Sequence, residues 1–221
     1  MGTDYVDLFL LHSQLIENDH ESQKPDSSFV ATGNLTTLKS FYDAVVPAME
    51  TLKKEGKILN WGIGPGQEEA VCDVINSTTP PEAIQCGVNV LNSLGAIGYA
   101  SIKPNPKLVL EESKKKDIPI LAIRAVQAGA LTSKMDREPH PSGFDHPDFA
   151  DYEKAQPFRE LAEDWGESPA SLAHRYALSI DKVGSVILGI KNRQELIECL
   201  EAEKKGRLDI EQILTLENLF N

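Results

Sequence analysis

Residues 5–11 read YVDLFLL, an apolar run that only Asp7 interrupts. Such a run is typical of a strand that is buried on both faces of a sheet. Similar runs predict four further strands, at residues 58–63, 83–91, 118–126 and 185–190. Because a segment with helical periodicity follows each run, we expect parallel strands joined by right-handed crossovers, which is the α/β fold class.

The segments between these strands carry the spacing of amphipathic helices. In the first of them, Phe41, Val45, Met49 and Leu52 recur at helical intervals. The helices expected are 41–52, 68–75, 106–116, 152–165, 169–179, 192–203 and 209–219. No linker and no break in composition divides the chain, so we expect residues 1–221 to form a single domain.

The composition of the chain excludes several classes of protein. It has 221 residues with 41% apolar and 25% charged residues, as in an ordinary globular protein, and a net charge of −12. That charge repels phosphate backbones, which argues against nucleic-acid binding and against acidic membranes. No apolar run is long enough to span a membrane, and from the residues after Met1 we expect no signal peptide. The three scattered cysteines have neither zinc-site nor disulfide spacing, so we expect a reducing, cytoplasmic location.

Two polar segments are long for a compact α/β unit. Residues 13–39 and 132–156 both follow the carboxyl end of a predicted strand. In a parallel barrel this is the face that binds substrate, so the two segments are either a substrate rim or surface insertions. The second segment contains His140, Asp145, His146 and Asp148, but their spacing defines no coordination geometry, and we expect no metal.

Two places at strand ends could carry chemistry. His12 closes the first strand, where an imidazole is suited to polarise a carbonyl or relay a proton, although a structural histidine is an equal alternative. Gly189, Lys191 and Arg193 surround the end of the last strand, and Asn192 with Glu195 has the pattern of a capping box. A helix N-terminus with added basic charge predicts a phosphate pocket; the alternative is a capped helix with two solvated cations.

Polar groups in and after two other strands are further candidates. Gln127–Leu131 (QAGAL) forms a turn in which Gly129 would allow a diphosphate to approach the backbone. Arg124 lies in an otherwise apolar strand and therefore needs a carboxylate or phosphate partner. Gln85 and Asn89 lie on the same face of their strand and either pair in the core or contact a ligand.

Longer motifs resemble the aldo-keto reductases, in the order in which that family carries them. GTDYVDLFLLH (2–12) resembles the family's fourth strand, and VVPAMETLKKEGKILNWGIG (45–64) its following helix and fifth strand. The other matching motifs are IQCGVNVLN (84–92), ILAIRAVQAGALTSK (120–134), SPASLAHRYAL (168–178) and VILGIKNRQELIECLEA (186–202). The resemblance covers nearly the whole chain. It implies a (β/α)₈ TIM barrel, represented here by about five βα units, because strands one to three have no counterpart.

The resemblance also implies an activity. Family members reduce aldehydes or ketones with NADPH, using an Asp and a Tyr after strand two, a Lys after strand three and a His after strand four. Of these residues only His12 carries over, so it is the one catalytic residue that the resemblance implies. None of the five tyrosines matches the family's general acid.

The cofactor residues are better represented. The resemblance assigns Gln85 to the nicotinamide carboxamide, and Gln127, Gly129 and Leu131 to the diphosphate loop. It assigns Gly189, Lys191, Glu195 and Glu198 to the adenosine-phosphate region. Arg193, which adds basic charge beside Lys191, and Arg124, which needs an anionic partner, are further candidates for cofactor binding. The chain departs from the family at Gly64-Pro65, which replaces a Ser-Asn pair, at Ile123, which replaces an aromatic residue, and at Cys199, which replaces Asn.

Two functions remain open at this stage. The first is an NADP-dependent oxidoreductase that reduces small carbonyl compounds or oxidises the corresponding alcohols, with NAD as a possible cofactor, impaired because the chain is truncated. The second is a catalytically inactive remnant that binds nucleotide or a protein partner. In both cases exposed barrel edges could cause self-association.

Overall fold

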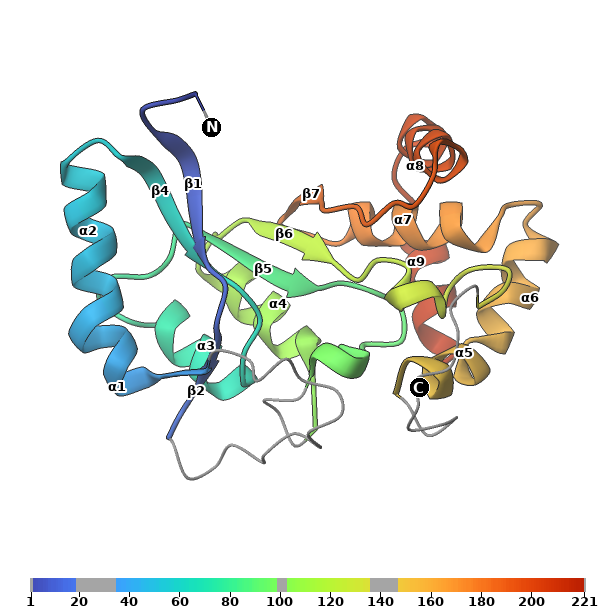
Figure 1. The fold of residues 1–221 in the computed structure, drawn as a ribbon. Helices are drawn as coiled ribbons and strands as arrows, with labels where there is room; N and C mark the ends of the chain where they lie inside the picture. The colour runs from blue at the N-terminus through green and yellow to red at the C-terminus, as the bar shows by residue number, and fades with distance from the viewer. Residues whose placement is uncertain (1, 19–34, 99–102, 136–146, 221) are drawn as a thin grey trace. The chain divides into compact units, whose positions relative to one another are not determined.

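The computed structural model describes residues 2–18, 35–98, 103–135 and 147–220 (Figure 1). The chain divides into two compact units by the density of its contacts. The first unit comprises Met1–Cys86 and Ile97–Ile120, and the second comprises Gly87–Ala96 and Leu121–Asn221.

The fold is α/β with a parallel sheet. Its strands are β1 (Val6–Leu11), β4 (Ile58–Ile63), β5 (Ala83–Gly87), β6 (Ile120–Ile123) and β7 (Val183–Val186). They follow one another in the order β1-β4-β5-β6-β7, which is also the chain order, as expected for consecutive βα units. Within the described residues the sheet does not close, since β1 and β7 each have one neighbour.

Backbone hydrogen bonds inside each unit define this order. In the first unit β1 and β4 pair in parallel from Val6–Ile58 to Leu11–Ile63, and the Ile84 N–H donates to the carbonyl of Pro119 at 3.1 Å. In the second unit the Ile187 N–H donates to the carbonyl of Ala122 at 2.8 Å. The carboxyl ends of these strands therefore carry the loops in which function is expected.

The first unit packs helices around Trp61 and Phe41, which are both fully buried. Its helices are α1 (Leu38–Ser40), the π-helical turn η1 (Phe41–Val45), α2 (Val46–Lys54), α3 (Glu68–Ile75) and α4 (Pro106–Lys115). A second, two-stranded parallel sheet joins β2 (Gln14–Ile16) to β3 (Leu35–Thr37). The short 3₁₀ turn η2 (Gly95–Ile97) follows β5.

The second unit has its own apolar core, which includes Leu131, Phe158, Leu172 and Leu216. Its helical elements are η3 (Gln127–Gly129), α5 (Pro147–Lys154), α6 (Gln156–Asp164), α7 (Pro169–Ser179), α8 (Arg193–Lys205) and α9 (Ile210–Asn218). The predicted cap of α7 is confirmed: the Ser168 hydroxyl accepts from the Ser171 N–H at 3.2 Å, and Pro169 lies in the first turn.

Three strand predictions were wrong in extent. β5 ends at Gly87 instead of 91, because the Asn89 side chain bonds the backbone of Ser93 and turns the chain. β6 ends before Arg124, whose φ of 60° is incompatible with a strand. β7 covers Val183–Val186 instead of 185–190, since the chain leaves the strand before its most apolar residues.

The expected burial of the first strand was also wrong. One face of β1, with Asp7 and Phe9, is exposed, and so is Tyr5 directly before the strand; Phe9 keeps 45% of its surface accessible. The other face is partly buried. An apolar run does not by itself show that both faces are covered.

The two long polar segments contain more structure than the sequence predicted. The first holds β2 and β3, in which Leu15 and Ile16 are almost completely buried. The second holds α5, and the helix expected at 152–165 is two helices, since α6 begins anew after Ala155 with Pro157 in its first turn. His140, Asp145 and His146 lie outside the described residues.

Candidate functional site

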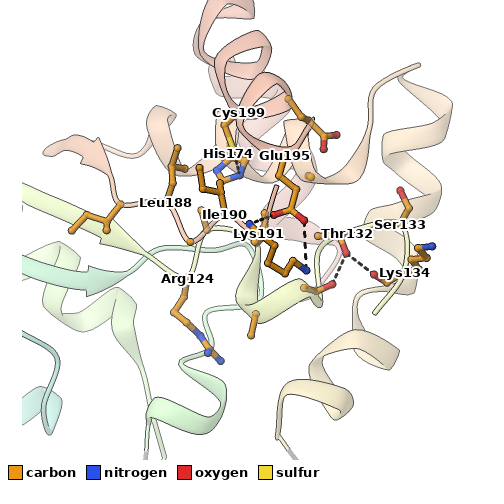
Figure 2. A pocket seen from close by; sticks show the side chains of 18 residues that line it. Arg124, Thr132, Ser133, Lys134, His174, Leu188, Ile190, Lys191, Glu195 and Cys199 are labelled. Atoms are coloured by element: carbon orange, nitrogen blue, oxygen red, sulfur yellow. Dashed lines mark hydrogen bonds and ion pairs between the residues drawn. The ribbon is translucent and has the colours of Figure 1, made fainter. Parts of the chain in front are cut away.

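A pocket of about 570 Å³ lies within the second unit (Figure 2). Three parts of the chain form its wall: the turn and loop after β6, the segment Ile187–Lys191 after β7, and the facing sides of α7 and α8. Its polar side chains include Thr132, Lys134, Lys191 and Glu195. A volume of this size suits part of a nucleotide or another small organic molecule.

The turn after β6 has an unusual backbone. Arg124, Gln127 and Ala128 are non-glycine residues with positive φ angles of 60°, 45° and 52°. Such angles are uncommon outside glycine and are held by surrounding contacts. Gly129 follows with φ of 100°, where a side chain would be strained, and its carbonyl accepts from the Thr132 hydroxyl at 2.8 Å. At Ala128 and Gly129 the turn therefore presents backbone that carries no bulky side chain to the pocket.

The start of α8 forms the opposite part of the wall. Asn192 caps the helix, since its side chain accepts from the Glu195 N–H at 3.0 Å. The capping box expected here is only half formed: the Glu195 carboxylate accepts from the Lys191 N–H at 2.8 Å instead of from the backbone of Asn192. The ammonium of Lys191 lies 3.6 Å from the same carboxylate. The cation is therefore held at the pocket rim by its acidic neighbour.

A histidine and a cysteine meet at the wall formed by α7 and α8. His174 Nε2 lies 3.3 Å from the Sγ of Cys199, as Figure 2 shows. His174 is only 8% exposed, and its Nδ1 has no hydrogen-bond partner among the described residues. Burial lowers the pKa of His174, although the charge of Glu198 opposes this effect, and burial raises the pKa of the Cys199 thiol. The pair is therefore a neutral imidazole beside a protonated thiol near neutral pH.

Sequence reasoning did not select His174. Ala170 and His174 lie four residues apart on α7 and both line the pocket. The helical period places them on one face, and this signal was available in the sequence. The contact of His174 with α8 could not be predicted from the sequence, because its partner Cys199 lies 25 residues further along the chain.

The need of Arg124 for an anionic partner is confirmed. Its guanidinium forms an ion pair with Asp148 and donates from Nε to Gln127 Oε1 at 2.9 Å. Figure 2 shows the side chain pointing away from Lys191 and Glu195. The partner is thus a carboxylate of the protein, on α5.

The remaining predicted residues of the second unit divide into two groups. Gly129, Gly189, Lys191, Glu195 and Glu198 line the pocket together with Arg124. The side chains of Gln127 and Leu131 are fully buried, and Arg193 is exposed at the first position of α8 outside the pocket wall. Their roles toward a cofactor stay predictions.

Two predicted residues lie in the first unit. His12 is exposed directly after β1, and Gln85 is half-buried within β5. The Gly64 N–H donates to the Leu11 carbonyl at 3.0 Å, so the chain segments that begin with His12 and Pro65 leave neighbouring strand ends. The roles of His12 and Gln85 stay predictions.

Other kinds of site are not found in the described part of the chain. No cluster of three or more His, Cys, Asp or Glu side chains there could hold a metal ion. None of the helices between residues 35 and 220 for which the structure gives a description is long and apolar enough to cross a membrane.

The pocket has the chemistry that a nucleotide needs. Gly189 exposes its backbone, since a Cβ added there would meet no atom within 4 Å. Lys134 and Lys191 bring positive charge to the wall, and Ile187, Leu188 and Ile190 bring apolar surface. Phosphates bind to cations and backbone N–H groups, while a base or ring needs apolar contact. The residues present therefore fit part of a dinucleotide.

The chain matches a known protein family. Residues 1–220 match the model of the aldo/keto reductase family, and the chain belongs to that family. A curated relative is the uncharacterized oxidoreductase YqkF of Bacillus subtilis, which is 25% identical over 223 residues; the match covers 99% of this chain and 61% of the relative.

Solved structures of the family share the fold. The holo form of aldo-keto reductase AKR11C1 from Bacillus halodurans superposes with a TM-score of 0.70 at 19% identity, covering 98% of this chain and 59% of that one. The thermostable aldo-keto reductase Tm1743, in complex with the inhibitor epalrestat, gives a TM-score of 0.62 at 17% identity, covering 98% and 61%. The chain thus spans about three fifths of the length of these relatives.

Proposed function

We propose that this chain is the nucleotide-binding part of an NADP-dependent oxidoreductase that reduces aldehydes or ketones to alcohols. The observation that carries the proposal is the pocket of the second unit, which Gly129 from the turn after β6 lines together with Gly189 and Lys191 from the segment after β7. Membership of the aldo/keto reductase family supports an oxidoreductase function in general. A related structure was solved in a holo form, which supports binding of a cofactor.

Each of the predicted site residues would have its own role in binding the cofactor or the substrate. Lys191 and Lys134 would attract the phosphates, Gly189 leaves open space for them at the backbone, and Gly129 lines the same pocket from the turn after β6. When bound, NADPH would supply the hydride. His12 would orient and polarise the substrate carbonyl, and Gln85 would bind the carboxamide of the cofactor. Small carbonyl compounds or the corresponding alcohols would be the substrates.

Catalysis by these 221 residues alone would be slow. None of the five tyrosines matches the general acid of the family, and a positioned proton donor contributes roughly 10²–10⁴-fold to the rate. We therefore expect measurable binding of NADPH with little or no turnover of aldehydes. Rapid turnover by the chain would show that another group supplies the proton.

Isothermal titration with NADPH and NADH tests the proposal. The informative variant is Lys191→Ala, which removes a cation from the pocket wall. We expect it to weaken NADPH binding about tenfold, or roughly 1.4 kcal/mol. Lys204→Ala is the matched control, because Lys204 lies on the same helix, is exposed and pairs with Glu201. Equal effects of both variants, or no binding by the unsubstituted chain, would contradict the proposal.

A second candidate function is a non-enzymatic protein that binds a nucleotide or a protein partner. The observation that favours it is the exposed apolar surface of the first unit, where Phe9 and Leu59 are about half accessible. Apolar surface of this kind marks interaction sites. Stable oligomers without NADPH binding would favour this function over the first.

A further inference from the structure

A cluster of polar side chains contacts the turn that follows β6. It joins three segments of the second unit: the end of the loop after β5, the turn 124–129 and the helix α5. We call it the Asp148 cluster; its members are Asn89, Ser93, Arg124, Gln127, Asp148 and Asp151. Residues of the same turn, among them Arg124, Ala128 and Gly129, also line the pocket.

The contacts of Asp148 connect α5 to the turn. Its carboxylate is 1% exposed, pairs with the Arg124 guanidinium, and accepts from the Ala96 N–H at 3.2 Å. Removing one partner of a buried ion pair leaves the other without compensation, so this charge is a strong constraint on Arg124.

Asp151 connects the same helix to the turn a second time. Its carboxylate accepts from Gln127 Nε2 at 2.6 Å and from the Ser93 hydroxyl at 2.6 Å. The amide oxygen of Gln127 in turn accepts from Arg124 Nε at 2.9 Å. Arg124 and Gln127, which both have a left-handed backbone in this turn, are thus each held by a carboxylate of α5.

The backbone of the turn explains why such contacts are needed. Arg124, Gln127 and Ala128 all have positive φ, which costs free energy in a non-glycine residue and persists only when surrounding contacts determine it. Gly95 shows how tightly the cluster is packed. A Cβ at this position would collide with the carboxylate of Asp148, the guanidinium of Arg124 and the amide of Gln127.

We propose that Asp148 and Asp151 are positioning residues for nucleotide binding, which act through Arg124 and Gln127 to hold the turn 124–129 in the shape that forms the pocket wall. This inference rests on the proposed function of the pocket. Neither carboxylate is part of the pocket wall, so their effect is indirect.

The test compares Asp148→Asn with a buried ion pair elsewhere in the same unit. Glu167 pairs with Arg175, with side chains that are 7% and 13% exposed, and neither residue lines the pocket. We expect Asp148→Asn to raise the dissociation constant for NADPH at least tenfold, measured by calorimetry well below the unfolding temperature. Glu167→Gln should lower the unfolding temperature but leave the dissociation constant within twofold.

Further variants separate positioning from loss of folding. If Asp148→Asn does not fold, Asp151→Asn and Gly95→Ala disturb the same cluster from its other sides, and we expect the same weakening of NADPH binding. Because Asp148 acts through Arg124, the double variant Arg124→Gln with Asp148→Asn should bind no more weakly than Arg124→Gln alone. Amide hydrogen exchange at residues 127–132 should be faster in Asp148→Asn than in Glu167→Gln.

The outcomes that would overturn the inference are distinct. NADPH binding by the unsubstituted chain together with unchanged binding by the cluster variants would overturn this proposal and leave the proposed function standing. Additive effects in the double variant would also overturn it, because they would show that Asp148 does not act through Arg124. No binding by the unsubstituted chain would overturn the proposed function and this inference with it.

Discussion

The Nε2 atom of His174 lies 3.3 Å from the Sγ atom of Cys199, at the wall of the pocket in the second unit. The two residues come from different helices, α7 and α8, which pack against each other. Their protonation states follow from burial, and this makes the pair accessible to two kinds of measurement.

The first prediction concerns the reactivity of the Cys199 thiol. Burial and the charge of Glu198 raise its pKa, so little thiolate is present at pH 7.5. We expect iodoacetamide to modify Cys199 several-fold more slowly than a cysteine in an unstructured peptide, and NADPH to slow the reaction further. Peptide mass spectrometry over time measures both effects.

An internal control for this experiment is Cys72. Burial raises the pKa of that thiol to about 11, and it lies on α3 in the first unit. Its modification should be slow as well but should not respond to NADPH. Modification of Cys199 faster than the peptide would contradict the assignment of a protonated thiol.

The second prediction concerns stability at mildly acidic pH. Burial lowers the pKa of His174 in the folded chain below the value of about 6.5 of an unfolded histidine. The unfolded chain therefore binds a proton that the folded chain does not, and stability is lost as the pH falls below about 6.5. Urea unfolding between pH 7.5 and 5.5 should show a steeper loss for the wild type than for His174→Gln. Identical slopes would mean that His174 takes up a proton in the folded chain as readily as in the unfolded one.

Much of the fold could be predicted because it depends on local signals. The predicted β4 and α3 have the bounds that the structure gives them, and α7 begins at the cap that Ser168 and Pro169 indicate. Apolar periodicity and caps act within a few residues of the chain. Family membership, which motif order indicated, is confirmed over residues 1–220.

The errors arose where contacts distant in sequence decide the structure. The short strands β2 and β3 pair with each other although they lie about twenty residues apart in the sequence, and no local pattern predicts either of them. The apolar residues Ile187, Leu188 and Ile190 resemble a strand but lie after β7, where they are partly exposed. An apolar run in the sequence is compatible both with a paired strand and with an apolar pocket wall, so the pattern alone does not distinguish them.

The candidate site shows the same division. Pattern placed Gly129, Gly189 and Lys191 at strand ends, and all three line one pocket. The need of Arg124 for an acidic partner could be predicted from its apolar surroundings, but not that Asp148, 24 residues away, provides it. The contact of His174 with Cys199 likewise depends on how two helices pack.

The third prediction concerns the core of the first unit. Trp61 is almost completely buried, and its Nε1 donates to the Glu50 carboxylate at 2.7 Å. Trp61→Phe removes this hydrogen bond and leaves a small cavity, which together should cost about 1–3 kcal/mol in urea unfolding. Glu50→Gln keeps an acceptor oxygen at an exposed position and should cost less than about 0.5 kcal/mol. A loss in Trp61→Phe no larger than in Glu50→Gln would show that the indole does not organise this core.

The fourth prediction concerns self-association through the first unit. Phe9 on β1 and Leu59 on β4 are 45% and 48% exposed, and β1 has only one strand neighbour among the described residues. Exposed apolar side chains beside an unpaired strand edge favour association between copies. Sedimentation velocity of the wild type should show species larger than the monomer as the concentration rises through the micromolar range.

Substitution of Phe9 and Leu59 tests whether the surface that they form causes the self-association. The double variant Phe9→Gln with Leu59→Gln should shift the association to at least tenfold higher concentration, because it removes apolar area from an exposed face. Leu214→Gln on α9 is the matched control, since Leu214 is 50% exposed but lies in the second unit. All three substitutions are at exposed positions, so the unfolding free energies should change by no more than about 0.5 kcal/mol each. Association that persists in the double variant and disappears in Leu214→Gln would place the contact on α9 instead.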